Sequence, residues 1–393
     1  MLKTRRRQFI KTGMYSSLSQ LIISILIISC TGQKAEQDIK SRTRNIDTDS
    51  LILAQFNNYD IPAIAVGIFD TDSVLVYAYG IRNTIDRTPV SQDDRFHIGS
   101  CTKAITSFVA ARLVEKGLIN WDTRIIDVFP GLSGLMDPYY QDKTLAEILS
   151  HRAGIQPFTS AIEFRIIPDS VLNYEGSNER QIFSEWLLTQ SPAIEEDQKY
   201  IYSNAGYSVA ATMLEKVSGK SWETLVEEEF FDVFGISGSL GHPDLSDTHQ
   251  PHGHIIPIQW GIGDSNELNP IPDSLDYNLR FIQPAGDISL SVYDYSVFLR
   301  EILKALLNEG SKLKQETYDY MFFEYDDYSM AWGKFKNNII QYLSHDGSDG
   351  TFYCRVLISR EKEYGLVILA NAGTDDTVKG IYAISNYINR KIR

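Results

Sequence analysis

The sequence predicts an α/β protein of the α+β type, with an antiparallel sheet that is built from both ends of the chain and flanked by helices. Two β-rich runs at 63–69 and 74–80 are separated by turn-forming residues, and a second pair of runs lies at 352–358 and 364–371. The stretch between these pairs, from about 100 to 310, has mainly helical periodicity. We therefore expect a mainly helical domain inserted into a sheet domain.

The longest helical pattern begins near residue 100. Its apolar residues recur at helical spacing up to Gly117, which predicts an amphipathic helix opened by Ser100. Further helices are expected at 49–59, 207–217, 221–234, 292–308 and 377–392. The stretch 235–283 is rich in Pro, Gly and His and lacks periodicity, so we expect loops over a cleft there.

These patterns also predict the domain boundaries. A signal peptide at 1–29 and a polar tether at 30–48 are expected to precede a folded domain at 49–393. The folded domain is expected to contain a sheet subdomain at about 49–99 and 311–393, and a helical subdomain at about 100–310.

The composition of the 393 residues, 43% hydrophobic and 22% charged, is that of a globular protein with a substantial core. The formal net charge is −14 at pH 7. Nucleic-acid binding needs a basic surface that contacts phosphates, so we expect no nucleic-acid partner.

The first thirty residues resemble an export signal. Arg6 and Arg7 begin a motif similar to the twin-arginine export motif, and an apolar stretch follows at 18–28. That stretch is about half of the roughly 20 residues that a membrane span requires, although a transmembrane anchor is the alternative. Residues 27–30, Ile-Ile-Ser-Cys, resemble a bacterial lipobox, which implies cleavage before Cys30 and lipid attachment to its sulfur. We therefore expect a lipoprotein that is anchored to a membrane through Cys30 on the periplasmic side of the cell envelope.

The two other cysteines, Cys101 and Cys354, would then lie in an oxidising compartment, where they could pair. Cys101 falls on a helix that we expect to be buried. Two small buried hydrophobic residues are therefore the favoured interpretation.

A histidine-rich run lies in the expected loops and contains His249, His252 and His254, with Asp247 nearby. The run matches no zinc-ligand spacing, so we interpret these residues as loop histidines. We expect no metal and no cofactor.

Three short patterns carry residues suited to nucleophilic catalysis: Ser-Cys-Thr-Lys at 100–103, Tyr-Ser-Asn at 202–204 and His-Asp-Gly at 345–347. Each pattern also occurs elsewhere, as Ser-Lys-Leu-Lys at 311–314, Tyr-Ile-Asn at 387–389 and His-Ile-Gly at 97–99. Only the first set combines the start of a long helix with spacing wide enough for separate elements to converge on one site.

Ser100 and Lys103 are the candidate nucleophile and its base. A serine hydroxyl is a poor nucleophile until a base takes its proton, and residues at i and i+3 share a helix face. Burial disfavours the charged form of lysine, which lets Lys103 accept a proton. The start of a helix also presents N–H groups to a developing oxyanion. The alternative is that Ser100 only caps the helix and that Lys103 is solvated.

Tyr202 and Asn204 can enter one cavity, because residues two apart in an extended segment point the same way. A phenol near an ammonium group has a lowered pKa and can exchange protons. Asn204 can bind a substrate amide or Lys103. Taken alone, a structural tyrosine and a turn asparagine would explain the same pattern. His345 is either a site residue or a polar strand-end residue, and Gly347 allows close backbone approach to a substrate.

Together these patterns resemble the serine hydrolases related to class C β-lactamases and D-alanyl-D-alanine carboxypeptidases. The resemblance runs from about 52 to 391 and implies a β-lactamase/transpeptidase-like fold. Supporting stretches are Phe-His-Ile-Gly-Ser-Cys-Thr-Lys at 96–103, Leu-Ser-His-Arg-Ala-Gly at 149–154, Tyr-Ser-Asn-Ala-Gly-Tyr at 202–207, Pro-Ala-Gly-Asp at 284–287 and Met-Ala-Trp-Gly at 330–333.

The resemblance implies that Ser100 forms an acyl-enzyme and that Lys103 and Tyr202 exchange its proton. Tyr202 would then help to activate the deacylating water. The backbone N–H groups of Ser100 and Ser348 would form the oxyanion hole.

The resemblance also implies the substrate-binding residues Asn204, His345, Gly347 and Ser348. His345 stands where β-lactamases usually carry lysine, which favours peptide or ester cleavage over antibiotic hydrolysis. His151 is expected to be structural, because it lies at a corner between a helix and a loop.

Three carboxylates, Asp287, Asp346 and Asp349, lie near the site motifs in the sequence. A site that recognises a substrate carboxylate usually presents cations. We therefore expect a substrate that lacks a free carboxylate beside the scissile bond.

The predicted function is that of a serine hydrolase cleaving an amide or ester bond in a small-molecule or peptide substrate through acyl-Ser100. The alternatives are a penicillin-binding receptor or weak relative that acylates without turnover, and a plain binding protein. The sequence makes no prediction about the oligomeric state.

Overall fold

The structure is a computed structural model that describes residues 48–391 except 161, 175, 195–197, 273–279 and 338–339. The predicted signal peptide, Cys30 and nearly all of the predicted tether lie outside these described residues. Within the described part of the chain, no helix is long and apolar enough to cross a membrane.

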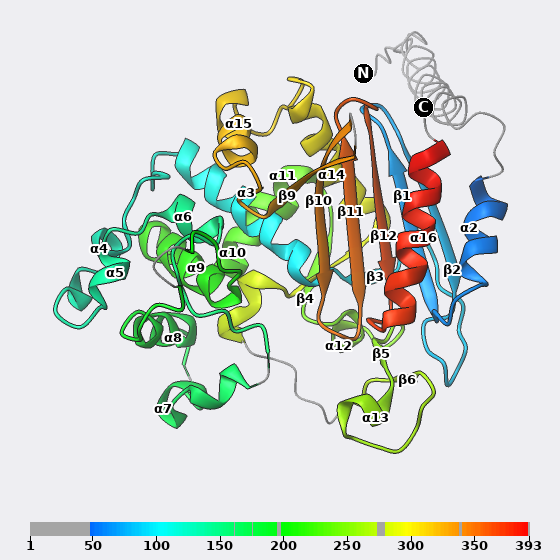
Figure 1. The fold of residues 1–393 in the computed structure, drawn as a ribbon, viewed down its shortest axis with the longest axis horizontal. Coiled ribbons are helices and arrows are strands. Elements are labelled where there is room, and N and C mark those ends of the chain that lie inside the picture. The colour runs from blue at the N-terminus through cyan, green and yellow to red at the C-terminus, as the bar shows by residue number, and fades with distance from the viewer. Residues whose placement is uncertain are drawn as a thin grey trace, which may run out of the picture.

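A seven-stranded antiparallel sheet forms the centre of the fold, in the strand order β2-β1-β12-β11-β10-β9-β8 (Figure 1). Its strands are β1 (Ala63–Phe69), β2 (Val74–Gly80), β8 (Tyr328–Ser329), β9 (Trp332–Asn337), β10 (Ile340–Ser348), β11 (Tyr353–Ser359) and β12 (Tyr364–Ala370). Strand β1 pairs with β12, so that Ile64 lies opposite Ala370. The two ends of the chain therefore meet in one sheet, as predicted.

Helices cover both faces of this sheet (Figure 1). On one face lie α2 (Thr48–Phe56) and α16 (Asp375–Lys391), and on the other α14 (Val292–Leu306) contacts β1 and β12. Side chains alternate along a strand, so Val66 packs in the core under α2 and α16 while its neighbour Ala65 packs in the larger core on the opposite face. The observed architecture confirms the predicted α+β fold class. The division into two subdomains stays a prediction.

The helical part surrounds α3 (Thr102–Glu115), which follows the 3₁₀ turn η1 (Gly99–Cys101). The other elements of this part that matter below are α6 (Leu145–Leu149), α8 (Glu179–Leu187), α9 (Asn204–Ser218), α10 (Trp222–Val226), the π-helical turn η4 (Glu227–Phe231), the 3₁₀ turn η5 (Arg280–Ala285) and α15 (Gln315–Phe323). The remaining helices and turns are α4 (Ile125–Val128), η2 (Pro130–Leu132), α5 (Pro138–Gln141), η3 (Glu163–Ile166), α7 (Asp169–Leu172) and α11 (Asp232–Phe234).

Helix α3 is buried on every side for its first three turns, so the predicted amphipathic helix is wrong. The reason is that α3 packs against α9, α10, α15, η4 and η5 at once. Even its hydroxyl groups are inside the protein: Thr106 donates to the carbonyl of Pro284 at 2.8 Å, and Ser107 Oγ lies 3.3 Å from Tyr207 Oη. These bonds satisfy polar groups that would otherwise be costly to bury.

The stretch expected to form loops contains several short elements instead: β4 (Gly238–Leu240), α12 (Pro243–Ser246), β5 (His254–Ile255), α13 (Pro257–Trp260) and β6 (Asn269–Pro270). Elements this short are invisible to periodicity. Strand β4 joins β3 (Arg95–His97) and β7 (Ile288–Ser291) in a second sheet of three strands, with β7 at its centre.

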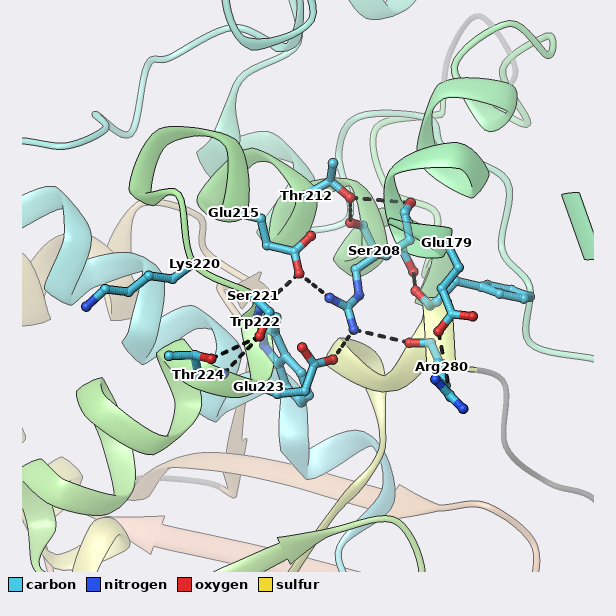
Figure 2. Close-up of polar contacts among 12 residues, drawn as sticks. Glu179, Ser208, Thr212, Glu215, Lys220, Ser221, Trp222, Glu223, Thr224 and Arg280 are labelled. Atoms are coloured by element: carbon cyan, nitrogen blue, oxygen red, sulfur yellow. Dashed lines mark hydrogen bonds and ion pairs between the residues drawn. The ribbon is translucent and has the colours of Figure 1, made fainter. Parts of the chain in front are cut away.

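The buried guanidinium of Arg180 links three helices that lie near α3. Arg180 of α8 forms ion pairs with Glu215 of α9 and Glu223 of α10, and these two carboxylates lie beside Trp222 (Figure 2). Arg180 also donates to the carbonyl of Arg280 at 3.2 Å. Arg280 begins η5, so this cluster sets the position of the turn whose last residue, Ala285, contacts the candidate site.

Candidate active site

Ser100 lies half-buried in the η1 turn, between β3 and the buried helix α3. The preceding Gly99 has a φ of +51°, and a Cβ atom there would lie 2.5 Å from the backbone nitrogen of Ser348. Only glycine tolerates both this conformation and this contact without strain. The turn that carries Ser100 is therefore pressed against the end of strand β10.

Lys103 is fully buried, and its amine has three neighbours. The Nζ atom lies 3.1 Å from Ser100 Oγ, 2.7 Å from Asn204 Oδ1 and 2.7 Å from the carbonyl oxygen of Ala285. Burial lowers the pKa of Lys103 well below its usual 10.5. The structure thus brings the predicted base to the predicted nucleophile and favours its unprotonated form.

Tyr202 belongs to the same group, since its hydroxyl forms a hydrogen bond with Ser100 and Lys103 Nζ lies 4.8 Å from the centre of its ring. The expected lowering of the Tyr202 pKa is wrong. Burial raises that pKa, and the hydrogen bond with Ser100 only partly opposes the rise. The expectation relied on a neighbouring ammonium, whereas burial disfavours the ammonium form of Lys103.

Asn204 is already bound at both ends of its amide. Its Oδ1 accepts from Lys103, and its Nδ2 donates to the carbonyl of Phe158 at 2.9 Å. Its backbone nitrogen donates to the carbonyl of Pro157 at 2.8 Å, at the first residue of α9. Of the two partners predicted for Asn204, the structure brings Lys103 to it.

Gly347 and Ser348 lie at the end of β10, directly against η1. A Cβ atom on Gly347 would collide with the carbonyl oxygen of Ile98 and lie 2.9 Å from the nitrogen of Ser100. Glycine at this position therefore permits the backbone nitrogens of Ser100 and Ser348 to lie close together.

His345 is buried in the middle of β10, two residues before Gly347, and is not at a strand end. Its Nδ1 lies 3.6 Å from Cys101 Sγ, and its Nε2 lies 3.4 Å from Tyr328 Oη. Both Cys101 and Cys354 are buried and free, as predicted. Burial opposes ionisation of Cys101, but contacts with Cys354 and His345 outweigh it and lower the pKa of Cys101 to about 6.

Two residues that the sequence analysis did not assign to the site lie behind Tyr202. His151, at the corner after α6, accepts from the backbone nitrogen of Ser203 at 3.1 Å, and its ring centre lies 4.2 Å from that of Tyr202. Tyr328 packs 5.1 Å from His151, between that ring and His345. The only sequence signal for Tyr328 was the neighbouring stretch at 330–333.

The carboxylates expected to repel an anionic substrate are already engaged. Asp346 faces the opposite side of β10 from His345 and pairs with Arg355 at 2.9 Å, while Tyr382 donates to it at 2.6 Å. Asp349 pairs with His242, and Asp287 accepts from Gln283. The argument from acidic neighbours is therefore weakened, because all three carboxylates are bonded and strand alternation turns Asp346 away from His345. A substrate without a free carboxylate stays a prediction.

The predicted loop histidines do not form a cluster. His249 pairs with Asp247, His252 pairs with Asp244, and His254 is bonded to the backbone of Asn371. Among the described residues, the ligand-type side chains that converge are instead His97, His242 and Asp349.

Comparison with known proteins finds a match to the sequence profile of the family described as Beta-lactamase, over residues 34–386. Unguisins hydrolase ungD of Aspergillus violaceofuscus is 23% identical over 363 residues, which cover 85% of this chain and 62% of that protein. Penicillin-binding protein 4 of Amycolatopsis lactamdurans is 24% identical over 329 residues, covering 80% of this chain and 82% of that protein. The chain therefore spans less than two thirds of the first of these relatives.

Solved structures share the fold. The class C β-lactamase from Rhodobacter sphaeroides superimposes with a TM-score of 0.66 at 18% identity, over 87% of this chain and 99% of that one. The structure of SurE gives a TM-score of 0.70 at 17% identity, over 88% of this chain and 75% of that one.

Proposed function

The chain belongs to the β-lactamase family of serine hydrolases, and we propose that it cleaves an amide or ester bond through a covalent acyl-Ser100 intermediate. The observation that carries this proposal is the contact between Ser100 Oγ and the buried amine of Lys103 at 3.1 Å.

The partners of Lys103 support a role as the base that activates Ser100. An unprotonated amine has two N–H groups and one lone pair. The carbonyl oxygens of Asn204 and Ala285 take the two N–H groups, which leaves the lone pair for the hydroxyl proton of Ser100. Lys103 accepts that proton as the bond forms between Ser100 Oγ and the substrate carbonyl carbon.

The backbone of η1 and β10 supports stabilisation of the resulting oxyanion. As the carbonyl double bond opens, its electron pair moves to the oxygen, and the N–H groups of Ser100 and Ser348 donate to it. When the tetrahedral intermediate collapses, the leaving group departs with a proton relayed from Lys103 through Tyr202. Water then attacks the acyl-ester: Tyr202 takes a proton from the water as it passes its own phenolic proton to Lys103, and Lys103 returns a proton to Ser100 Oγ as the ester bond breaks.

The third motif favours peptides or esters over β-lactams as substrates. His345 is an imidazole held between Cys101 and Tyr328, in the place where the β-lactamases carry a lysine ammonium. The substrate face of the site therefore lacks that fixed cation. The receptor alternative, which acylates without turnover, shares all of these groups and differs only in deacylation.

A substrate panel tests the proposal. Short-chain esters, D-amino-acid peptides and a chromogenic cephalosporin are assayed with the wild-type chain, with Ser100→Ala and with Ser311→Ala as a matched control in the other Ser-x-x-Lys motif. We expect turnover of an ester or peptide that Ser100→Ala abolishes and Ser311→Ala leaves intact. A stoichiometric burst without turnover would favour the receptor, and activity that survives Ser100→Ala would exclude the proposed nucleophile.

We also propose that the chain is exported and anchored through a lipid on Cys30. The basis is the twin-arginine-like and lipobox-like sequence of the first thirty residues. Fractionation of cells that express the wild type or Cys30→Ser tests this. The wild type should be found with membranes and should incorporate labelled fatty acid, whereas the variant should do neither. Equal membrane association of both would contradict lipid anchoring and favour a transmembrane anchor.

A further inference from the structure

Two imidazoles and a carboxylate meet inside the protein beside the nucleophile's turn. One ligand atom from each of His97, His242 and Asp349 lies within 4.8 Å of the other two. Asp349 Oδ2 lies 2.5 Å from His242 Nε2 and 3.5 Å from His97 Nδ1. The three residues come from β3, from the segment before α12 and from the turn after β10, so the fold itself brings them together.

The hydrogen bonding of His97 aims an unprotonated nitrogen into this cluster. Its Nε2 lies 3.2 Å from Asp287 Oδ1, where it can donate only if it carries the proton. That tautomer leaves Nδ1 with a free lone pair. Within the described part of the chain Nδ1 is buried and has no hydrogen-bond partner. A carboxylate that holds the outer N–H of a histidine while the inner nitrogen binds is the usual support of a metal-ligating imidazole.

From this arrangement we propose that His97, His242 and Asp349 bind a divalent transition-metal ion of the zinc type. Two imidazole nitrogens and one carboxylate oxygen suit zinc or cobalt, whereas magnesium and calcium prefer all-oxygen sites. Three protein ligands leave a fourth position for water. Ligand atoms around a tetrahedral ion with bonds of about 2.0–2.2 Å lie about 3.4 Å apart. The pair at 3.5 Å already has this separation, whereas Asp349 and His242, at 2.5 Å, would have to move apart.

A hydrogen-bonded cluster without an ion explains less. A proton shared between His242 and Asp349 accounts for their short contact. It leaves Nδ1 of His97 without a hydrogen bond, 3.5 Å from Asp349 Oδ2, and a buried polar atom in that state costs free energy. An ion at the centre satisfies all three groups at once.

A bound ion would hold two segments of the backbone beside Ser100 in place. Asp349 directly follows Ser348, and His97 lies three residues before Ser100. An ion bound by both would hold together the two backbone segments whose N–H groups are proposed to receive the oxyanion. This consequence for activity rests on the proposed function, whereas metal binding itself does not.

Zinc and cobalt binding to the full-length chain tests the proposal. Chelator-treated protein is titrated with Zn²⁺ and its metal content measured by mass spectrometry, for the wild type, His242→Asn and the control His249→Asn, whose side chain is 87% exposed. We expect one Zn²⁺ per chain in the wild type and the control. We expect an affinity at least about 100-fold weaker in His242→Asn, since loss of a ligand costs no less than loss of its support. Zn²⁺ should also raise the Tm of the wild type but not of His242→Asn.

The Co²⁺ spectrum of the wild type keeps the test independent of variants that fold poorly. Tetrahedral bands without a thiolate charge-transfer band would support a nitrogen and oxygen site. Thiolate bands, unchanged affinity in a folded His242→Asn, or no stoichiometric Zn²⁺ in the wild type would each overturn the proposal. Labelling of Ser100 by a fluorophosphonate in the metal-free protein separates failure of the metal site from failure of the proposed catalysis.

Discussion

The side-chain nitrogen of Lys103 lies 3.1 Å from the hydroxyl oxygen of Ser100, and the side chain of Lys103 is fully buried. Two carbonyl oxygens, from Asn204 and Ala285, hold the amine in this position. Under the proposed function, we expect the protonation state of Lys103 to control the reactivity of Ser100 and to contribute to the pH dependence of stability.

The first prediction concerns pH. Burial lowers the pKa of Lys103 well below 10.5, and the base must be unprotonated, so acylation is active above the folded-state pKa and is lost as pH falls through it. In Lys103→Arg, whose guanidinium stays charged, the acylation rate should fall by about 10²–10⁴. Stopped-flow acylation with a neutral ester measures both effects. A rate that rises only near pH 10.5 would contradict the role of Lys103.

The same shift has a consequence for stability. The unfolded chain binds a proton at Lys103 up to about pH 10.5, whereas the folded chain releases it at a lower pH. Between the two values the unfolded state binds more protons, so this group makes the free energy of unfolding rise with pH. Urea unfolding of the wild type and Lys103→Met across that window should show a steeper rise of the free energy of unfolding with pH in the wild type than in the variant. Parallel curves would indicate a protonated Lys103 in the folded state.

The second prediction separates chemistry from packing at Tyr202. Tyr202→Phe keeps the ring against His151 but removes the hydroxyl that bonds Ser100. We expect kcat to fall by about 10²–10⁴ with little change in the Tm. The matched control is Tyr200→Phe, because Tyr200 also packs on His151. Equal losses in the two variants would reduce Tyr202 to a structural role.

The third prediction concerns the backbone contact between β10 and η1. Gly347→Ala places a methyl group against the carbonyl of Ile98 and the nitrogen of Ser100. We expect the free energy of unfolding to fall by about 1–3 kcal/mol and the acylation rate to fall with it, since the two N–H donors are forced apart. Gly131→Ala is the control, because a Cβ atom there meets nothing within 4 Å. Full activity in Gly347→Ala would show that the close approach is unnecessary.

The fourth prediction tests the orientation of Asp346. Its carboxylate pairs with the buried Arg355 on the side of the sheet away from Ser100. Asp346→Asn should therefore lower the free energy of unfolding by about 1–2 kcal/mol through the weakened pair. It should leave unchanged the ratio of kcat/KM for an anionic and a neutral version of one substrate. A shift of that ratio toward the anionic substrate would show that the Asp346 carboxylate acts on the bound substrate.

The sequence predicted the sheet well, because strands such as β1 and β2 are continuous apolar runs separated by a tight turn. The convergence of Ser100, Lys103 and Tyr202 was predictable from motif order and from the i, i+3 spacing on a helix. Burial of α3 on every side was not, since it depends on five elements that pack from distant parts of the chain.

The remaining errors have similar causes. The raised pKa of Tyr202 follows from burial that no local pattern reveals. The direction of Asp346, away from Ser100, could have been predicted from strand alternation, because Asp346 lies between His345 and Gly347 in the same strand. The contact of His97 with His242 and Asp349 joins residues 107 or more positions apart and has no sequence signal. His97 lies in His-Ile-Gly at 97–99, which the sequence analysis set aside as a second occurrence of the third site motif.

Active-site labelling followed by peptide mass spectrometry tests the central claim most directly. The wild-type chain, Ser100→Ala and Ser311→Ala are each treated with a fluorophosphonate, digested and sequenced. We predict a single labelled residue, Ser100, in the wild type and in Ser311→Ala, and no label in Ser100→Ala. A label on any other serine, or a folded wild type that takes no label, would contradict Ser100 as the nucleophile.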